Sequence, residues 1–141
     1  MRNPDKYLRT AYVTALKLAT GLPVYAKSVP AGITAKKYIV LDSQSKSQTV
    51  RAKVDYFEWL ARINVNIYSI NDAGNFAPIN TDDIEEQVLS TVLDGVQIDG
   101  FHNKNADLVS TQDLSLNFSS KAVDRKLLIF EHWLAEKEVT T

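Results

Sequence analysis

The sequence contains no cysteine and only two histidines, His102 and His132. The absence of cysteine excludes disulfides, thiolate nucleophiles and thiolate metal ligands, and it suits a reducing compartment. Neither histidine has a second histidine or a carboxylate at metal-ligand spacing, because Glu131, next to His132, points to the opposite face of a strand. We therefore expect both histidines to be ordinary surface or packing residues, and we expect no metal and no cofactor.

Other signatures of catalysis and of membrane insertion are missing as well. The five glycines are scattered at turns and form no phosphate-binding loop, and there is no Gly-x-Ser-x-Gly elbow. No apolar run approaches the roughly 18 residues that cross a bilayer, and the N-terminal residues are polar. These absences predict a protein that is not an enzyme, has no signal peptide and does not enter a membrane.

The strongest positive signal is residues 57–70, FEWLARINVNIYSI, in which apolar and polar side chains alternate. Alternation of this length, rich in β-branched and aromatic residues, is typical of a half-buried strand. Its odd-numbered side chains would lie together on one buried face of a sheet, with a mostly polar face opposite. These buried side chains are Phe57, Trp59, Ala61, Ile63, Val65 and Ile67.

Two amphipathic helices are predicted, one before and one after this strand. The first spans about 4–20, with Asn3 as its cap and Gly21 as the left-handed residue that ends it. The second begins after Thr81 as its cap and ends at Gly95, and it would cover the apolar face of the strand. Its first turns contain four acids, where the helix dipole favours them: Asp82, Asp83, Glu85 and Glu86.

The remaining segments predict a largely antiparallel mixed sheet. We expect strands at 24–26, 37–41, 114–118 and 126–134, the start of another at 96–98, and a loop at 99–107. Residues 42–53, DSQSKSQTVRAK, have no apolar periodicity and predict either a mobile loop or a hairpin arm that orders against another surface. The order α-β-β-β-α-β-β predicts a single α+β domain over 1–141, with a flexible polar loop at 42–53 and two flanking helices.

Charge is divided between the two ends of the sequence. Residues 1–53 contain ten Lys or Arg and two acids, whereas residues 54–141 contain six Lys or Arg and fifteen acids. One interpretation is ordinary solvated surface; the other is that opposite poles attract copies of the molecule head to tail. A dedicated nucleic-acid binder is not indicated, because the pI is about 6.1 and the polar segment 42–53 contains no aromatic residue.

The order of these segments resembles that of phage tail-terminator and tail-completion proteins. The likeness rests on the helix ending in GLPVY, the KYIVL strand, the polar loop, the strand containing INVNIYS, the helix TDDIEEQVLSTVL and the late strand LLIFEHWL. It covers most of the chain and rests on no invariant motif, and it gives no guidance on how the segment 99–125 docks.

This resemblance implies a non-catalytic virion protein that forms a ring, usually a hexamer, at the end of the tail tube or in the neck of a tailed phage. The ring terminates tail-tube assembly and joins the tail to the head. The implied partners are other copies of the chain and other tail and neck proteins. DNA passes through such a ring without sequence-specific binding, and no membrane is involved.

Charged side chains are the expected contacts of such a ring. On the basic side we expect Lys46, Arg51 and Lys53 of the polar segment, which would order on assembly; on the acidic side we expect Asp82, Asp83, Glu85 and Glu86. A monomeric cytoplasmic binding module, or a small enzyme with an unrecognised site, is the alternative interpretation. The size of the protein in solution distinguishes the two.

Overall fold

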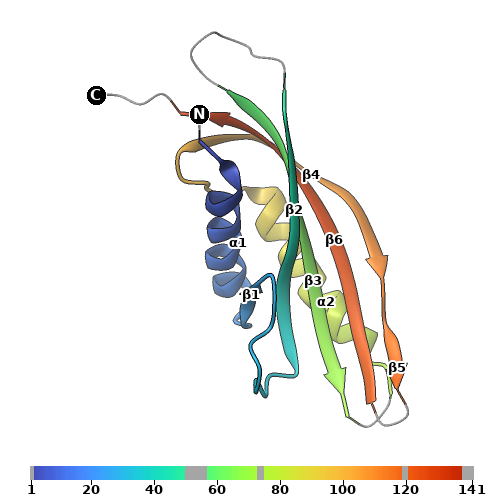
Figure 1. Cartoon of the computed structure of the whole chain (residues 1–141). Helices are drawn as coiled ribbons and strands as arrows, with labels where there is room; N and C mark the ends of the chain where they lie inside the picture. The colour runs from blue at the N-terminus through green and yellow to red at the C-terminus, as the bar shows by residue number, and fades with distance from the viewer. Residues whose placement is uncertain (1, 50–56, 73–74, 119–120, 138–141) are drawn as a thin grey trace.

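The computed structural model describes residues 2–49, 57–72, 75–118 and 121–137, and every structural statement below concerns these ranges. The chain folds into two helices and a six-stranded sheet, in agreement with the predicted α+β class (Figure 1). The elements are α1 (Pro4–Thr20), β1 (Val24–Ala26), β2 (Lys37–Gln48), β3 (Glu58–Asn71), α2 (Pro78–Asp94), β4 (Phe101–Asp113), β5 (Leu116–Phe118) and β6 (Lys121–Glu136).

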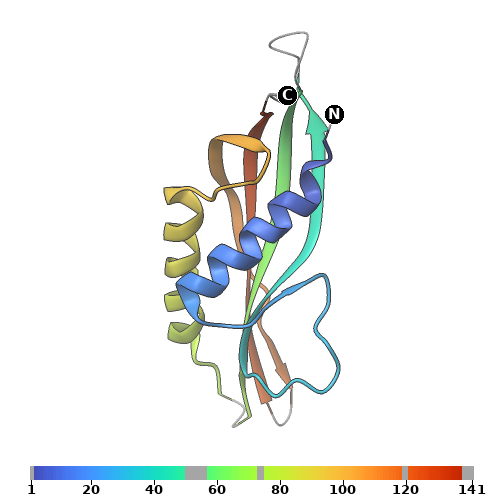
Figure 2. The same cartoon turned by 90° about the vertical axis from the view of Figure 1, so that its left-hand side faces the viewer.

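Both helices lie on the same face of a long, twisted sheet, as the two views in Figures 1 and 2 show. We call this the helix face. No helix of the described residues covers the opposite face, which carries Tyr38, Arg62, Glu131 and Asp107 and is called the open face below. Helix α1 lies over β1, β2 and β3, whereas α2 lies over β3, β6 and β4.

The strand order across the sheet is β1-β2-β3-β6-β4, and β5 also pairs with β6. The β1–β2 pair is parallel and all the others are antiparallel, so the predicted mixed, largely antiparallel sheet is confirmed. The central pair is β3 with β6, in continuous register from Glu58 opposite Ala135 to Asn71 opposite Ala122. Strands β1 and β4 stand at the two edges.

The first helix has the bounds and the caps that the sequence predicts. The Oδ1 atom of Asn3 accepts a hydrogen bond from the backbone N–H of Asp5 at 3.0 Å, and Pro4 occupies the first turn. Gly21 ends the helix at φ 69°, in the left-handed region, and its N–H donates to the Lys17 carbonyl. All of these signals are local, and for that reason the sequence alone located this helix.

The hydrophobic core lies between the helices and the helix face of the sheet. As predicted, alternate side chains of β3 point into it, from Trp59 to Ile67. They pack against Leu8, Tyr12 and Leu16 of α1 and against one stripe of α2. The fully buried members of the cluster on the second helix and on β6 are Val88, Val92, Leu128, Phe130 and Leu134.

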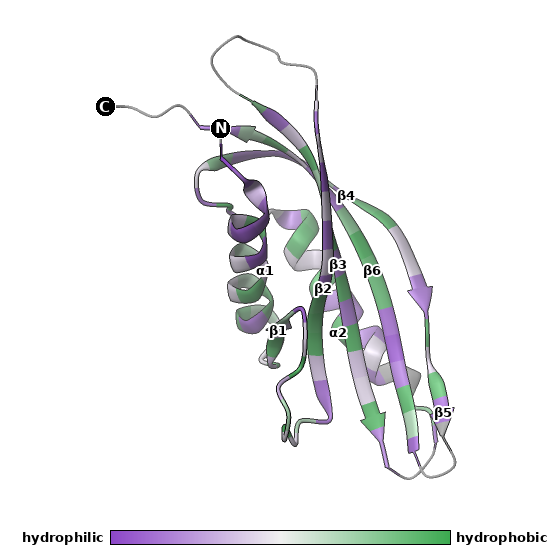
Figure 3. Cartoon of the chain, in the orientation of Figure 1, coloured by the Kyte–Doolittle hydropathy of each residue, from purple (hydrophilic) through white to green (hydrophobic). Residues whose placement is uncertain are grey.

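The predicted loop at 42–53 is wrong for residues 42–48, which continue β2 as one arm of a hairpin. After a bulge between Leu41 and Gln44, the pairing with β3 resumes and runs to Gln48 opposite Trp59. The hydropathy colouring in Figure 3 shows β2 changing from hydrophobic to hydrophilic along its length. Pairing with β3 satisfies its backbone, so the hairpin-arm alternative holds here; residues 50–56 lie outside the described ranges.

The second helix begins earlier than predicted, at Pro78 and with Ala77 as its cap residue, rather than after Thr81. Thr81 is buried inside the helix, and no acid falls in the first turn. The N–H of Ala77 donates instead to the Oδ2 atom of Asp124 on β6, at 3.0 Å. This contact joins residues far apart in the sequence, and a local capping pattern therefore does not reveal it.

The segment 99–125 differs most from the prediction. Residues 99–107 were expected to be a loop, but Phe101–Asp113 form β4, whereas no strand forms at 96–98. Two bulges in β4, between Asn103 and Asn105 and between Leu108 and Ser110, break the alternation that marks a strand. An edge strand with one open side also needs few apolar residues, so its sequence looks like that of a loop.

Candidate functional site

The charged residues expected at an interface fall into two groups, and the basic group is partly used inside the chain. The Nζ atom of Lys46 lies 2.6 Å from the Oδ2 atom of Asp5 on α1, and both side chains are less than a third exposed. Gln44, two residues earlier, donates to the backbone carbonyl of the same Asp5 at 2.9 Å. Lys46 therefore joins α1 to β2. Arg51 and Lys53 lie outside the described residues.

The four acids of α2 separate into two pairs. Asp82 and Glu85 both contact the Nζ atom of Lys126 on β6, at 3.3 and 3.0 Å. The hydrogen bond with Glu85 is the main reason why the pKa of Lys126 is raised, so these two acids hold α2 against the sheet. Asp83 and Glu86 are exposed, have no ion-pair partner among the described residues, and line a shallow hollow of about 590 Å³.

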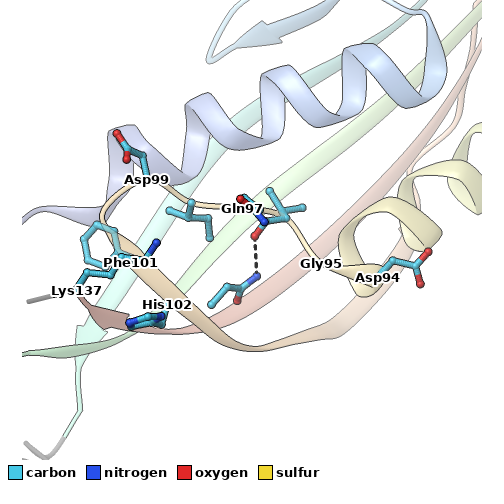
Figure 4. Close-up of a pocket in the computed structure, with 10 residues that line it drawn as sticks. Asp94, Gly95, Gln97, Asp99, Phe101, His102 and Lys137 are labelled. Carbon is cyan, nitrogen blue, oxygen red and sulfur yellow. Dashed lines mark hydrogen bonds between the residues drawn. The ribbon is translucent and has the colours of Figure 1, made fainter.

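A chain of buried and partly buried polar groups crosses the core from the middle of α1 to the start of β4. The Tyr12 hydroxyl contacts Nε2 of His132, and Nδ1 of His132 lies 3.1 Å from Oδ1 of Asn103. The side-chain amide of Asn103 donates to the Val96 carbonyl at 3.1 Å, the dashed line in Figure 4. We call these three side chains the buried relay. It joins α1, β6, β4 and the loop before β4.

The donors and acceptors of the buried relay fix the state of His132. Since the Asn103 amide nitrogen donates to Val96, its oxygen accepts, and Nδ1 of His132 carries the proton. Nε2 then accepts from the Tyr12 hydroxyl, which stays protonated because burial raises the pKa of Tyr12 well above its ordinary value. Burial also lowers the pKa of His132 to about 4. His132 is thus a neutral packing residue, as the sequence indicated.

A hollow of about 570 Å³ lies beside the relay, between the loop 94–99 and the start of β4 (Figure 4). Its labelled charged side chains, Asp94, Asp99 and Lys137, point in different directions and do not converge on one spot. His102, the second histidine, is exposed at its rim. Among the described residues, no group of three or more metal-ligand side chains occurs.

The open face carries a compact charged cluster near one end of the sheet. Glu58 is 3% exposed and accepts hydrogen bonds from Lys104 Nζ at 3.1 Å and from Trp133 Nε1 at 3.0 Å. The Lys104 ammonium also lies 4.5 Å from the centroid of the Trp133 ring. The hydrogen bond from Lys104 is the main cause that lowers the pKa of Glu58, so this carboxylate is charged and already paired.

A row of tyrosines crosses the open face at the other end of the sheet. The Tyr25 and Tyr38 ring centroids lie 6.1 Å apart, and those of Tyr38 and Tyr68 lie 5.0 Å apart, stacked. Arg125 continues the row at 5.4 Å from Tyr68 and donates two hydrogen bonds to Oδ1 of Asn66. Each contact joins neighbouring strands across the sheet and stabilises their register.

Sequence reasoning missed both open-face clusters because their members are far apart in the chain. Glu58, Lys104 and Trp133 come from three different strands. The only local indication of this face was that the even-numbered residues of 57–70 are mostly polar. The tyrosine row can be recognised only when the register of four strands is known.

In the described part of the chain, no helix has the length and apolar character of a membrane span.

Comparison with known proteins adds a fold but no family. No protein-family model matches the chain, and the curated proteins contain no significant match. A solved structure titled "Virion of native gene transfer agent (GTA) particle" contains a chain that aligns with a TM-score of 0.61. The alignment covers 96% of this chain and 99% of that chain, at 16% sequence identity. The two chains therefore share a fold over almost their whole lengths.

A second solved structure aligns with a TM-score of 0.45 at 13% identity, over 97% of this chain and 98% of that chain. This score is too low to indicate a shared fold.

Proposed function

We propose that this chain is a structural protein of a phage-like virion. The observation that carries the proposal is the full-length fold likeness to a chain of the gene transfer agent particle, with a TM-score of 0.61. The order of helices and strands, which resembles that of tail-terminator proteins, points in the same direction. Within such a particle the chain forms a closed ring, a hexamer, at the end of the tail tube or in the neck. There it terminates tube assembly and joins the tail to the head, without catalysing a reaction.

The distribution of charge over the fold supports a head-to-tail ring. The basic half of the sequence, residues 1–53, builds α1, β1 and β2, which lie together at one side of the sheet. The acidic half builds α2, β4 and β6, which lie at the other side and meet the first half at β3. Opposite charge on opposite sides favours a head-to-tail contact, in which one surface of each copy meets a different surface of the next. Contacts of this type can close into a ring.

The interface residues are part of the same proposal. Asp83 and Glu86 are the acidic contacts, since they are exposed and are not used inside the described chain. Arg51 and Lys53 remain the proposed basic contacts. Lys46, Asp82 and Glu85 act first within the subunit, through Asp5 and Lys126, and contribute to assembly by holding the helices in place. The other partners are tail and neck proteins, and DNA passes through the ring without sequence-specific binding.

Electron microscopy of labelled particles tests the placement. An antibody raised against the purified chain is bound to intact virions and to separated heads and tails, and the position of the gold label is recorded. We expect one label site per particle, at the junction of head and tail or at the head-proximal end of a free tail. Label distributed along the tube, or absent from all particles, contradicts the proposal.

A further inference from the structure

The edge of the sheet formed by β4 is long and open. Strand β4 is hydrogen-bonded to β6 along one side, and no described strand lies along its other side. Three of the exposed large hydrophobic residues lie on β4 and its continuation β5: Leu108 is 36% exposed, Val109 41% and Leu116 54%. An exposed strand edge with apolar side chains is a template for pairing with another strand, and soluble proteins normally protect it.

The opposite edge of the sheet is open as well, over a shorter stretch. Strand β1 pairs with β2 only from Ile39 to Leu41, whereas β2 continues to Gln48. After the bulge at residues 42 and 43, residues 44–48 pair with β3 on one side, and the whole stretch 42–48 has no described strand on the other. All of them except Gln44 are exposed. Each copy thus has one free edge at β4 and a second free edge at 42–48.

The directions of these two edges are compatible with pairing between copies. Strand β2 is antiparallel to β3, β3 to β6, and β6 to β4, so β2 and β4 run in opposite directions within one subunit. A neighbouring copy rotated about an axis roughly parallel to the strands keeps its β2 in the same direction. Its β2 would then meet β4 of the first copy in antiparallel fashion, with both helix faces on the same side of the continued sheet.

Long-range charge favours the same contact, because residues 1–53 contain ten Lys or Arg and two acids, whereas residues 54–141 contain six Lys or Arg and fifteen acids. The paired segments themselves are nearly neutral: residues 42–48 contain Asp42 and Lys46, and β4 contains Lys104, Asp107 and Asp113. The attraction therefore acts between the two sides of neighbouring copies, and the edge contact itself consists of backbone hydrogen bonds and apolar side chains.

We infer that β4 of one copy pairs antiparallel with residues 42–48 of β2 in the next copy, so that the sheets join into one continuous sheet around the ring. The partner is a second copy of this chain, and the contact consists of backbone hydrogen bonds with Leu108 and Val109 covered by the neighbour. This inference rests on the proposed ring and specifies how its subunits are joined.

Engineered disulfides test the contact, because the chain contains no cysteine of its own. Ser45 lies on the open face, opposite Arg62, and so do Asp107, Ser110 and Gln112 of β4, which lie opposite Glu131, Ile129 and Leu127. Three double variants combine Ser45→Cys with Asp107→Cys, Ser110→Cys or Gln112→Cys, and together they sample the possible registers. Within one subunit these positions are three strand spacings apart, roughly 14 Å, too far for a disulfide.

The matched control is Ser45→Cys with Thr111→Cys. Thr111 is exposed, like Gln112, but it pairs with Leu128 and so faces the helix side of the sheet. After oxidation of assembled protein, we expect a ladder of cross-linked chains in at least one of the three same-face variants and at least tenfold less cross-linking in the control. Rings seen by native mass spectrometry without a ladder in any same-face variant would overturn the inference while leaving the proposed function in place.

A second pair of variants tests the contact without cross-linking. Val109→Lys places a charge on the β4 edge, and Leu18→Lys places the same charge on α1, where Leu18 is 88% exposed. We expect both proteins to fold, with the concentration for half-assembly raised at least tenfold by Val109→Lys and unchanged by Leu18→Lys. Equal assembly of the two variants argues against the edge contact. Absence of rings in the wild-type protein at all concentrations would overturn the proposed function itself.

Discussion

Acidification is expected to destabilise the subunit through a single buried group, His132. This side chain is 0% exposed, is neutral, and accepts the Tyr12 hydroxyl hydrogen bond at Nε2. Burial lowers its pKa from the ordinary value of 6.5 to about 4. Protonation in the folded state would place a charge in the core and would turn Nε2 into a donor facing a hydroxyl that already donates. The folded state therefore resists the proton that the unfolded chain accepts.

The sign and size of the effect follow from this difference in pKa. Between pH 6.5 and 4 the unfolded chain binds a proton at His132 and the folded chain does not, so stability falls as the pH falls through this window. At 1.36 kcal/mol for each pKa unit, the full loss amounts to roughly 3 kcal/mol, with a limiting slope of about 1.4 kcal/mol per pH unit. Glu58 and Asp113 have lowered pKa values, so their contributions are lost at lower pH, below their ordinary values of 4.5 and 3.8.

Urea unfolding, followed by tryptophan fluorescence at pH 7.5, 6.5, 5.5 and 4.5, measures this slope. Two protein concentrations are compared, so that any contribution of assembly to the free energy of unfolding is recognised. The chain has only two histidines, and His102 is exposed, so His102→Gln is the matched control for His132→Gln. We expect His102→Gln to keep the wild-type slope. His132→Gln should be less stable at pH 7.5, and its free energy of unfolding should change little with pH.

A wild-type free energy of unfolding that is constant from pH 6.5 to 4.5 would show that His132 does not resist protonation in the folded state. The same conclusion follows if His132→Gln keeps the wild-type slope, because the titrating group would then lie elsewhere. If His132→Gln does not fold, an NMR titration gives the same answer: the imidazole signal of His132, assigned by its persistence in His102→Gln, should titrate near 4.

Three further predictions concern single elements. Asn3→Ala removes the side-chain cap of α1 and should lower the free energy of unfolding by about 1 kcal/mol in urea titrations; an unchanged midpoint would show that the cap is dispensable. Gly100→Ala should lower the free energy of unfolding in urea by roughly 1–3 kcal/mol, because Gly100 has φ +81° and a Cβ would collide with the Arg2 guanidinium. Adding Arg2→Ala removes the collision but not the backbone strain, so the double variant should recover only part of this free energy. Replacing both Asp83 and Glu86 by Lys should leave the subunit folded but prevent ring formation at low salt, because like charges then face each other across the contact. Rings should return at about 1 M salt, where the Debye length is about 3 Å and the repulsion is screened. Normal assembly of this variant at low salt places α2 outside the interface.

The parts of the fold that the sequence predicted are those determined by local signals. Helix α1 carries its own caps at Asn3 and Gly21, and β3 shows its buried face through unbroken alternation. Both signals come from neighbouring residues, so they are visible without knowledge of the rest of the chain. The bounds of these elements agree with the prediction to within a residue.

Elements that depend on distant partners were placed wrongly. The start of α2 is fixed by Asp124, 47 residues away from Ala77, so Thr81 was mistaken for its cap. The second half of β2 has a polar sequence and is held by β3 and by Asp5 of α1. Strand β4 is a polar, bulged edge whose order comes from β6.

The candidate site was predicted only in part, for the same reason. The sequence located the acids of α2, but it did not show that Asp82 and Glu85 are bound by Lys126, which leaves Asp83 and Glu86 exposed. The two free sheet edges were not predicted at all, because edges exist only once the strand order is known.

Native mass spectrometry of the purified chain shows whether its copies assemble into a closed ring. Spectra are recorded at low and at high ionic strength over a range of concentrations, and the masses are compared with multiples of the 15.8 kDa subunit. We expect one closed species of fixed copy number, six, with no intermediate ladder at saturation and with weaker assembly at high salt. A chain that remains monomeric under every condition, or that grows into a continuous series of sizes, would contradict it.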